Sequence, residues 1–186
     1  YSSAASDVYK RQDEMDAILE VYRKMGGQCH QVGGKLIVNG KNAGFPLELL
    51  ETDVYPGFPT DLQSPAMAVL ATIPGVSRIR EKIFEDRYKL ASWLCYMGAK
   101  IEIRDGIAVI HGGYPLKGCT VEAEELRGGA ALVITALAAE GVTRIRGCSF
   151  IERGYEHICE DLTALGGLLI TVSYTHLRAH ETPEHL

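Results

Sequence analysis

The chain has 186 residues, of which 46% are hydrophobic and 23% charged, values that are typical of a soluble globular domain with one ordinary core. Its net charge of -5 argues against a nucleic-acid-binding protein, which would show a basic balance or a basic stripe. No apolar run reaches the roughly 20 residues of a membrane-spanning helix, so we expect a cytoplasmic protein without a membrane partner.

The two ends of the chain share no periodicity with the rest. Residues 1–12 and 172–186 resemble translated sequencing-adapter sequence, which is seen at the edges of metagenome-derived fragments, so we set them aside from the fold argument. The domain is then expected over 13–171. The C-terminal segment holds three of the six histidines, and their spacing is not taken as a metal site: His176, His180 and His185.

The five cysteines are scattered and odd in number, and they never form a C-x-x-C pair. This pattern favours free thiols in a reducing cytosol over a metal site or a disulfide framework. The residues are Cys29, Cys95, Cys119, Cys148 and Cys159.

Helix and strand signals alternate between residues 13 and 171. In chain order we expect a helix over 13–25, two short strands within 29–40, a helix over 62–72, a strand over 76–80, a helix over 88–97, a hairpin of strands 100–103 and 107–111, a short strand at Val121, a helix over 126–140, a strand over 142–146, a helix over 155–165 and a strand over 168–171. The helix over 126–140 is apolar nearly all round, so it should be buried. The pattern predicts an α/β domain in which a layer of buried helices lies under outward-facing sheets.

One stretch of the sequence occurs twice. GVSRIREKIFEDR at 75–87 returns 66 residues later as GVTRIRGCSFIER at 141–153, with seven of thirteen positions identical. A Met/Leu-Gly helix stop also occurs three times, spaced by 72 and 68 residues. Units of about 70 residues favour threefold pseudosymmetry within one domain over a solenoid, whose units are usually about 20–50 residues long.

The repeat pairs charged residues at the joints between its elements. Asp61 corresponds to Arg127, and Arg87 corresponds to Arg153; each lies at or just before the start of an expected helix. Pseudosymmetry would bring equivalent helix starts to one end of the domain. Helix N-termini attract anions, and arginine offers a planar fork for carboxylate or phosphate. The sequence therefore predicts a site for an anionic ligand with a single base among cations.

Simpler interpretations of the same residues stay open. Asp61 could be a helix N-cap, and Arg87 and Arg153 could be surface residues. The glycine pair after Arg127 could admit a ligand close to the backbone, or could serve helix packing. The segment YPGFPTD at 55–61 could hold a carboxylate in a fixed place, or could be only a proline-rich connection.

Four motifs carry a resemblance to a known family: YPGFPTDLQ, IFEDR, EELRGGAALV and IERGYE. The motifs and their spacings resemble the UDP-N-acetylglucosamine 1-carboxyvinyltransferases, the MurA family, over essentially all of 13–171. The resemblance implies an inside-out α/β barrel, the enolpyruvyl transferase fold, with domains built from βαβαββ units. The chain would be most of one pseudo-threefold domain, from the C-terminal side of the enzyme.

The resemblance also implies a reaction and a set of site residues. The enolpyruvyl group of phosphoenolpyruvate would pass to the 3-hydroxyl of UDP-N-acetylglucosamine, the first committed step of peptidoglycan synthesis. Asp61 matches the carboxylate that contacts this hydroxyl and acts as general base. Ile83 matches a backbone contact to the UDP-sugar, Arg87 and Arg127 match ligands of phosphoenolpyruvate, and Arg153 matches a contact in the phosphate region. We expect no cofactor and no metal.

The sequence also departs from the family pattern. Glu125 stands before the LR motif where the family usually has Asp, and Glu152 stands in ERG where it has DRG. The family's reactive-cysteine loop belongs to an N-terminal-side domain that this chain would need as its partner, so we expect no turnover by the chain alone. Alternatives are the sister enzyme 3-phosphoshikimate 1-carboxyvinyltransferase, a non-catalytic βα-repeat interaction domain, and a piece that does not fold without the rest.

Overall fold

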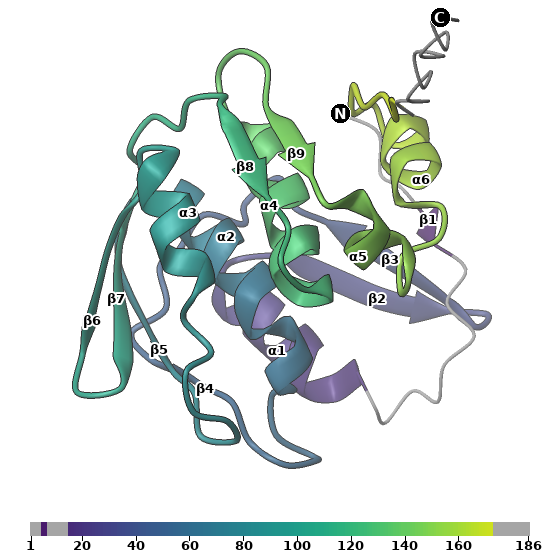
Figure 1. The fold of residues 1–186 in the computed structure, drawn as a ribbon. Helices are drawn as coiled ribbons and strands as arrows, with labels where there is room; N and C mark the ends of the chain where they lie inside the picture. Colours follow the sequence, from purple (N-terminus) through teal and green to yellow (C-terminus); the bar gives the residue numbers. More distant parts are fainter. Residues whose placement is uncertain (1–4, 7–14, 173–186) are drawn as a thin grey trace, which may run out of the picture. The chain divides into compact units, whose positions relative to one another are not determined.

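A computed structural model describes residues 5–6 and 15–172 (Figure 1). The chain divides into two compact units, residues 1–156 and 157–186. The first unit contains β1 (Ala5–Ser6), α1 (Asp16–Lys24), β2 (Gln28–Val32), β3 (Lys35–Asn39), β4 (Leu50–Glu51), the 3-10 helix η2 (Thr60–Leu62), α2 (Gln63–Thr72), β5 (Gly75–Arg80), α3 (Leu90–Tyr96), β6 (Lys100–Arg104), β7 (Ile107–Gly112), β8 (Thr120–Glu122), α4 (Leu126–Ala138), β9 (Arg144–Arg146) and α5 (Cys148–Glu152). The second unit contains α6 (Ile158–Ala164). Most of the two end segments that we set aside lies outside the described residues.

A four-stranded sheet with the order β4-β5-β7-β6 forms one side of the first unit (Figure 1). β4 runs parallel to β5, with Leu50 opposite Ile79, and β7 runs antiparallel to both β5 and β6. The hairpin between β6 and β7 turns at Asp105 and Gly106, which both have positive φ, the conformation that a tight hairpin turn requires. In chain order these elements read β4-α2-β5-α3-β6-β7, which is one complete βαβαββ unit.

The next unit begins with the same arrangement. β8 runs parallel to β9, and Val121 lies opposite Ile145 as Leu50 lies opposite Ile79. Ile79 and Ile145 are 66 residues apart, the spacing of the repeated stretch, so the repeat predicted from the sequence is present in the strand register. The helices α2 and α4 follow β4 and β8 in turn. The connection before α2 is the longer of the two, and it contains YPGFPTD.

The helices α2 and α4 form the buried layer beneath the sheet, as the sequence predicted. Both pack against each other, and α2 also packs against β5 and β7 (Figure 1). On β5 and β7 the inward residues alternate with more exposed ones, which is the pattern of a half-buried sheet. The fully buried side chains of this core include Met67, Leu70, Ile79, Leu94, Ile110 and Leu132.

The end of the described chain differs from the prediction. The expected helix over 155–165 is shorter, because α6 begins at Ile158, and the short helix α5 before it was not predicted. The expected strand over 168–171 is wrong for the described residues: Leu168 and Ile170 are 92% and 80% exposed, and the segment is irregular. A strand needs a neighbour to satisfy its backbone groups, and no described strand pairs with this segment.

The five cysteines, all of which lie in the part of the chain that the structure describes, form no disulfide there. Among residues 5–6 and 15–172 no helix combines the length and the apolar character needed to cross a bilayer.

The glycine pair at the start of α4 is explained by packing. A Cβ at Gly129 would lie 2.6 Å from Cγ1 of Ile151 on α5, which is closer than real contacts allow, and a Cβ at Gly128 would lie 2.7 Å from Oε1 of Glu125. Helix α5 can therefore approach α4 only because position 129 has no side chain. Of the two interpretations of this pair, the structure favours the helix-packing one.

Replacement of Gly129 by alanine should lower the stability of the protein. In an open helix this change would stabilise by about 0.8–1 kcal/mol, but overpacking against Ile151 costs roughly 1–3 kcal/mol. We expect Gly129→Ala to reduce the free energy of unfolding in urea, and the same change to be neutral or stabilising in an Ile151→Ala background. Equal effects in both backgrounds would contradict the packing explanation.

Candidate active site

An ion pair between Asp61 and Arg127 joins the two copies of the repeat. Nε of Arg127 donates a hydrogen bond of 2.5 Å to Oδ1 of Asp61, and the Arg127 and Asp61 side chains are 32% and 62% exposed. Asp61 lies in η2 directly before α2, and Arg127 lies in the first turn of α4. Neither η2 nor α2 has a side-chain cap, so Asp61 is not an N-cap. Two of the four helix starts that the repeat pairs, those of Asp61 and Arg127, therefore converge.

Glu125 holds the backbone of the first turn of α4. It is the N-cap, and its carboxylate accepts hydrogen bonds from the backbone N–H of Arg127, at 2.9 Å, and from that of Gly128. Asp61 raises the pKa of Arg127 above its usual value, through its hydrogen bond and its charge, and Glu125 adds to the effect. The guanidinium is therefore a fixed cation at the start of a helix that Glu125 caps.

The segment before Asp61 is closed on itself by its own backbone. Asp53 N–H donates to the carbonyl of Phe58 at 3.0 Å, and Gly57 N–H donates to the carbonyl of Val54 at 2.7 Å. Phe58 is buried, whereas Val54 and Tyr55 at the tip are exposed. These hydrogen bonds hold the loop in one conformation, so the backbone that leads into η2 and Asp61 has little conformational freedom.

Ile83 lies in a turn that Glu81 organises. Oε1 of Glu81 accepts hydrogen bonds from the backbone N–H of Ile83, at 2.8 Å, and of Phe84, at 3.2 Å. Oε2 of the same carboxylate accepts a hydrogen bond of 2.9 Å from the hydroxyl of Thr60, the residue before Asp61. One side chain thus connects the turn of Ile83 with the turn of Asp61.

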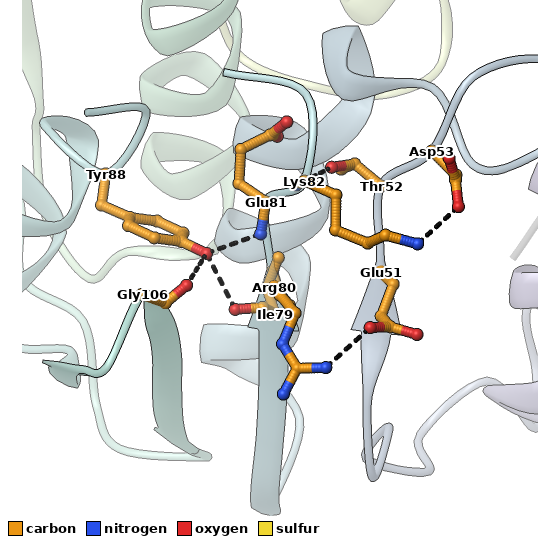
Figure 2. A network of polar contacts seen from close by, with 9 residues as sticks. All are labelled: Glu51, Thr52, Asp53, Ile79, Arg80, Glu81, Lys82, Tyr88 and Gly106. Atoms are coloured by element: carbon orange, nitrogen blue, oxygen red, sulfur yellow. Dashed lines mark hydrogen bonds and ion pairs between the residues drawn. The ribbon is translucent and has the colours of Figure 1, made fainter. Parts of the chain in front are cut away.

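Figure 2 shows how the backbone beside Glu81 is held from two sides. On one side, the Tyr88 hydroxyl accepts from the N–H of Glu81 at 2.8 Å and directs its own hydrogen to the carbonyls of Ile79 and Gly106, at 2.9 and 3.0 Å. Burial raises the pKa of Tyr88, so this hydroxyl keeps its proton at neutral pH. The turn after β5 is therefore fixed to the sheet through Tyr88.

Thr52 and Asp53, after β4, hold the other side of the same turn (Figure 2). Thr52 is fully buried, and its hydroxyl accepts from the N–H of Lys82 at 2.9 Å, while Nζ of Lys82 lies 2.6 Å from Oδ2 of Asp53. Lys82 lowers the pKa of Asp53 through this hydrogen bond. Beside them, Arg80 pairs with Glu51 across the two parallel strands at 2.8 Å.

Neither Arg87 nor Arg153 contacts the Asp61–Arg127 pair within the described residues. Arg153 directly follows α5, not a helix start as the sequence indicated, and the next residue, Gly154, packs against Leu126 of the first turn of α4. Arg87 lies 4.4 Å above the ring of Phe84. Within the described residues, neither Arg87 nor Arg153 forms an ion pair.

Three residues of this site were missed by sequence reasoning: Thr60, Glu81 and Tyr88. Their roles come from contacts between loops, and the repeat gives no signal for them, since Gly147 occupies the position equivalent to Glu81. Among the described residues no group of three His, Cys, Asp or Glu side chains is placed to hold a metal. The three C-terminal histidines lie outside those residues.

Comparison with known proteins defines the class. The family described as EPSP synthase (3-phosphoshikimate 1-carboxyvinyltransferase) matches residues 7–162. The chain belongs to this family. Its fold is similar to that of the enolpyruvyl transferase NikO from Streptomyces tendae, with a TM-score of 0.70 and 27% identity over 82% of this chain and 35% of that one. It also resembles an EPSP synthase from Acinetobacter baumannii, with a TM-score of 0.57 and 19% identity over 69% of this chain and 31% of that one.

Three curated relatives carry the same enzyme name. The chain is 50% identical over 117 residues to UDP-N-acetylglucosamine 1-carboxyvinyltransferase 2 of Symbiobacterium thermophilum, covering 63% of the chain and 28% of the relative. It is 39% identical over 160 residues to UDP-N-acetylglucosamine 1-carboxyvinyltransferase of Desulfofundulus thermocisternus, covering 86% and 65%, and 43% identical over 159 residues to that of Thermus thermophilus, covering 84% and 36%. The chain spans between 28% and 65% of the lengths of these relatives.

Removal of the Tyr88 hydroxyl should destabilise the protein. Tyr88→Phe leaves the part-buried N–H of Glu81 without its acceptor, which costs about 1–3 kcal/mol in the free energy of unfolding. Because burial raises the folded pKa of Tyr88, the wild type should lose this contribution as the pH rises above the unfolded value of about 10. The difference in the free energy of unfolding between the wild type and Tyr88→Phe, measured in urea, should therefore be smaller at pH 11 than at pH 7. The exposed Tyr96→Phe is the control, and equal effects of the two changes would contradict the assigned network.

Proposed function

We propose that the intact protein transfers the enolpyruvyl group of phosphoenolpyruvate to the 3-hydroxyl of UDP-N-acetylglucosamine and releases phosphate. The observation that carries the proposal is the Asp61–Arg127 pair at two converging helix starts, in a chain whose relatives bear the corresponding name. This reaction would be the first committed step of peptidoglycan synthesis, in cell-wall biogenesis. Five cysteines that form no disulfide within the described residues fit a cytoplasmic location.

Asp61 and Arg127 divide the chemistry between them. In the net reaction a bond forms between the sugar oxygen and the enolpyruvyl carbon, the bond from that carbon to the phosphate oxygen breaks, and the hydroxyl proton passes to the Asp61 carboxylate. Asp61 occupies Nε of Arg127, which leaves the two terminal nitrogens of the fork for the carboxylate of phosphoenolpyruvate. The pair thus places a proton acceptor next to the cation that holds the donor substrate.

The other three residues complete the substrate contacts in this proposal. The backbone of Ile83 contacts the UDP-sugar, and the cations Arg87 and Arg153 bind phosphoenolpyruvate and the departing phosphate. Arg87 must leave its place over the Phe84 ring to take part, which a long, partly exposed side chain can do by changing rotamer. The remaining groups of the site come from an N-terminal-side domain of the same enzyme. No cofactor or metal takes part in the proposed reaction.

A second candidate is transfer to shikimate 3-phosphate, favoured by the description of the matching family. The two reactions share the donor and differ in the acceptor. Calorimetric titration of the full-length enzyme distinguishes them: the proposal expects binding of UDP-N-acetylglucosamine and none of shikimate 3-phosphate at the same concentrations. The reverse result would establish the second candidate.

Removal of the base should affect turnover far more than binding. In the full-length enzyme, Asp61→Asn should lower kcat about 100-fold or more, while KM for UDP-N-acetylglucosamine changes little, because the amide oxygen still accepts a hydrogen bond. The control is Asp105→Asn, in the hairpin turn between β6 and β7, which should leave both constants unchanged. A near-normal kcat in Asp61→Asn would favour a non-catalytic interaction domain.

The 186-residue chain by itself should not turn over substrate. It carries one side of the site, and the proposal assigns the other side to the N-terminal-side domain. Incubation of the purified chain with both substrates should release no phosphate above the buffer control, whereas the full-length enzyme should release it. Phosphate release by the chain alone would contradict the assignment of essential groups to the other domain.

A further inference from the structure

Glu81 joins the two candidate contacts to the acceptor sugar. Asp61 follows β4 and Ile83 follows β5, and β4 and β5 are parallel neighbours, so the two connections leave the same end of the sheet. Asp61 lies in η2 and Ile83 lies in the turn after β5, and the sheet alone does not fix the distance between residues on separate connections. A direct tie between the loops is therefore what sets the spacing of the carboxylate and the backbone contact.

The Glu81 carboxylate makes that tie with both of its oxygens. Oε2 accepts from the hydroxyl of Thr60, and Oε1 accepts from the N–H groups of Ile83 and Phe84. Hydrogen bonds to an ionised acceptor are roughly twice as strong as those between neutral groups. The carboxylate is part-buried, so water competes less for these bonds than it would at an open surface.

The backbone of Glu81 is itself anchored. Tyr88 holds its N–H, and Thr52 holds the N–H of the next residue, Lys82 (Figure 2). The side chain of Glu81 thus extends from a backbone that is fixed to the sheet. The turns that contain Thr60 and Ile83 are both hydrogen-bonded to this side chain. A tie from a mobile residue would move with either loop and could not fix their separation.

We infer that Glu81 is a positioning residue that sets the distance between the Asp61 carboxylate and the Ile83 backbone, and so aligns the acceptor sugar with its base. This inference rests on the proposed function. Glu81 does not touch substrate; it acts through Thr60 and through the two N–H groups. Its loss should therefore affect the sugar more than the donor, because Glu125 holds the backbone of Arg127 independently of Glu81.

Steady-state kinetics of full-length Glu81→Ala test the inference. We expect kcat/KM for UDP-N-acetylglucosamine to fall about 10- to 100-fold, the range expected when reacting groups are misplaced by about 1 Å, while KM for phosphoenolpyruvate changes much less. Glu81→Gln should restore most of the loss. Its oxygen can still accept from both N–H groups, and its amide can donate to the Thr60 hydroxyl.

Thr60→Val removes only the hydrogen bond between Thr60 and Glu81. It therefore tests the inference even if Glu81→Ala does not fold. It keeps the shape of Thr60 and removes only the hydroxyl, so it should lower kcat/KM for the sugar in the same direction. The loss in the Glu81→Ala/Thr60→Val double variant should equal that of Glu81→Ala alone, because both changes break the same bond. Glu85→Ala removes an exposed carboxylate from the same turn and should leave the constants unchanged.

The outcomes separate this inference from the proposed function. A wild-type enzyme that makes no enolpyruvyl-sugar overturns the proposed function and the inference with it. An active wild type together with unchanged kinetics in Glu81→Ala and Thr60→Val overturns the inference alone. A lower melting temperature with unchanged KM and kcat would assign Glu81 a purely structural role and would also overturn it.

Discussion

The hydrogen bond from Arg127 to Asp61 depends on the repeated architecture of the chain. Two parallel strand pairs in the same register lead to two helices that pack side by side, and this packing brings residues 66 positions apart into contact. Identical charges at the two positions would repel each other. The two copies instead carry a carboxylate and a guanidinium. The repeat brings the two positions together, and the difference between the residues there makes an acid–base pair possible.

The Asp61–Arg127 pair matters more for the positions of its two charged groups than for the stability of the fold. Both side chains are partly exposed, and exposed ion pairs contribute only about 0–1 kcal/mol. The stability of the region comes from the apolar contact between α2 and α4 and from the close approach of α5 at Gly129. The helices are thus fixed by packing, and the charged residues at their starts are free to serve a ligand.

Much of this arrangement was predictable from the sequence because it follows from periodicity and repetition. The apolar helix α4, the hairpin at Asp105 and Gly106, and the equivalence of Asp61 with Arg127 all come from local pattern or self-comparison. The resemblance to a family added the identity of the fold, which composition and periodicity could not supply.

The predictions that failed depend on contacts outside the local sequence. A strand over 168–171 requires a partner strand, and α5 is a short helix set by its packing against α4. Glu81 and Tyr88 act between loops, so their types and spacing look ordinary in the sequence. The stacking of Arg87 on Phe84 likewise has no signal in the repeat, while its predicted role in substrate binding stays a prediction.

A double-mutant cycle on the reaction of the full-length enzyme tests the central claim, that the two helix starts form one functional unit. The cycle compares kcat/KM of the wild type, Asp61→Asn, Arg127→Gln and the double variant. The account predicts that the two losses are not additive, with a coupling of roughly 0.5–3 kcal/mol, as expected for residues in contact. Losses that add within about 0.5 kcal/mol would show that Asp61 and Arg127 act independently, and would contradict the account.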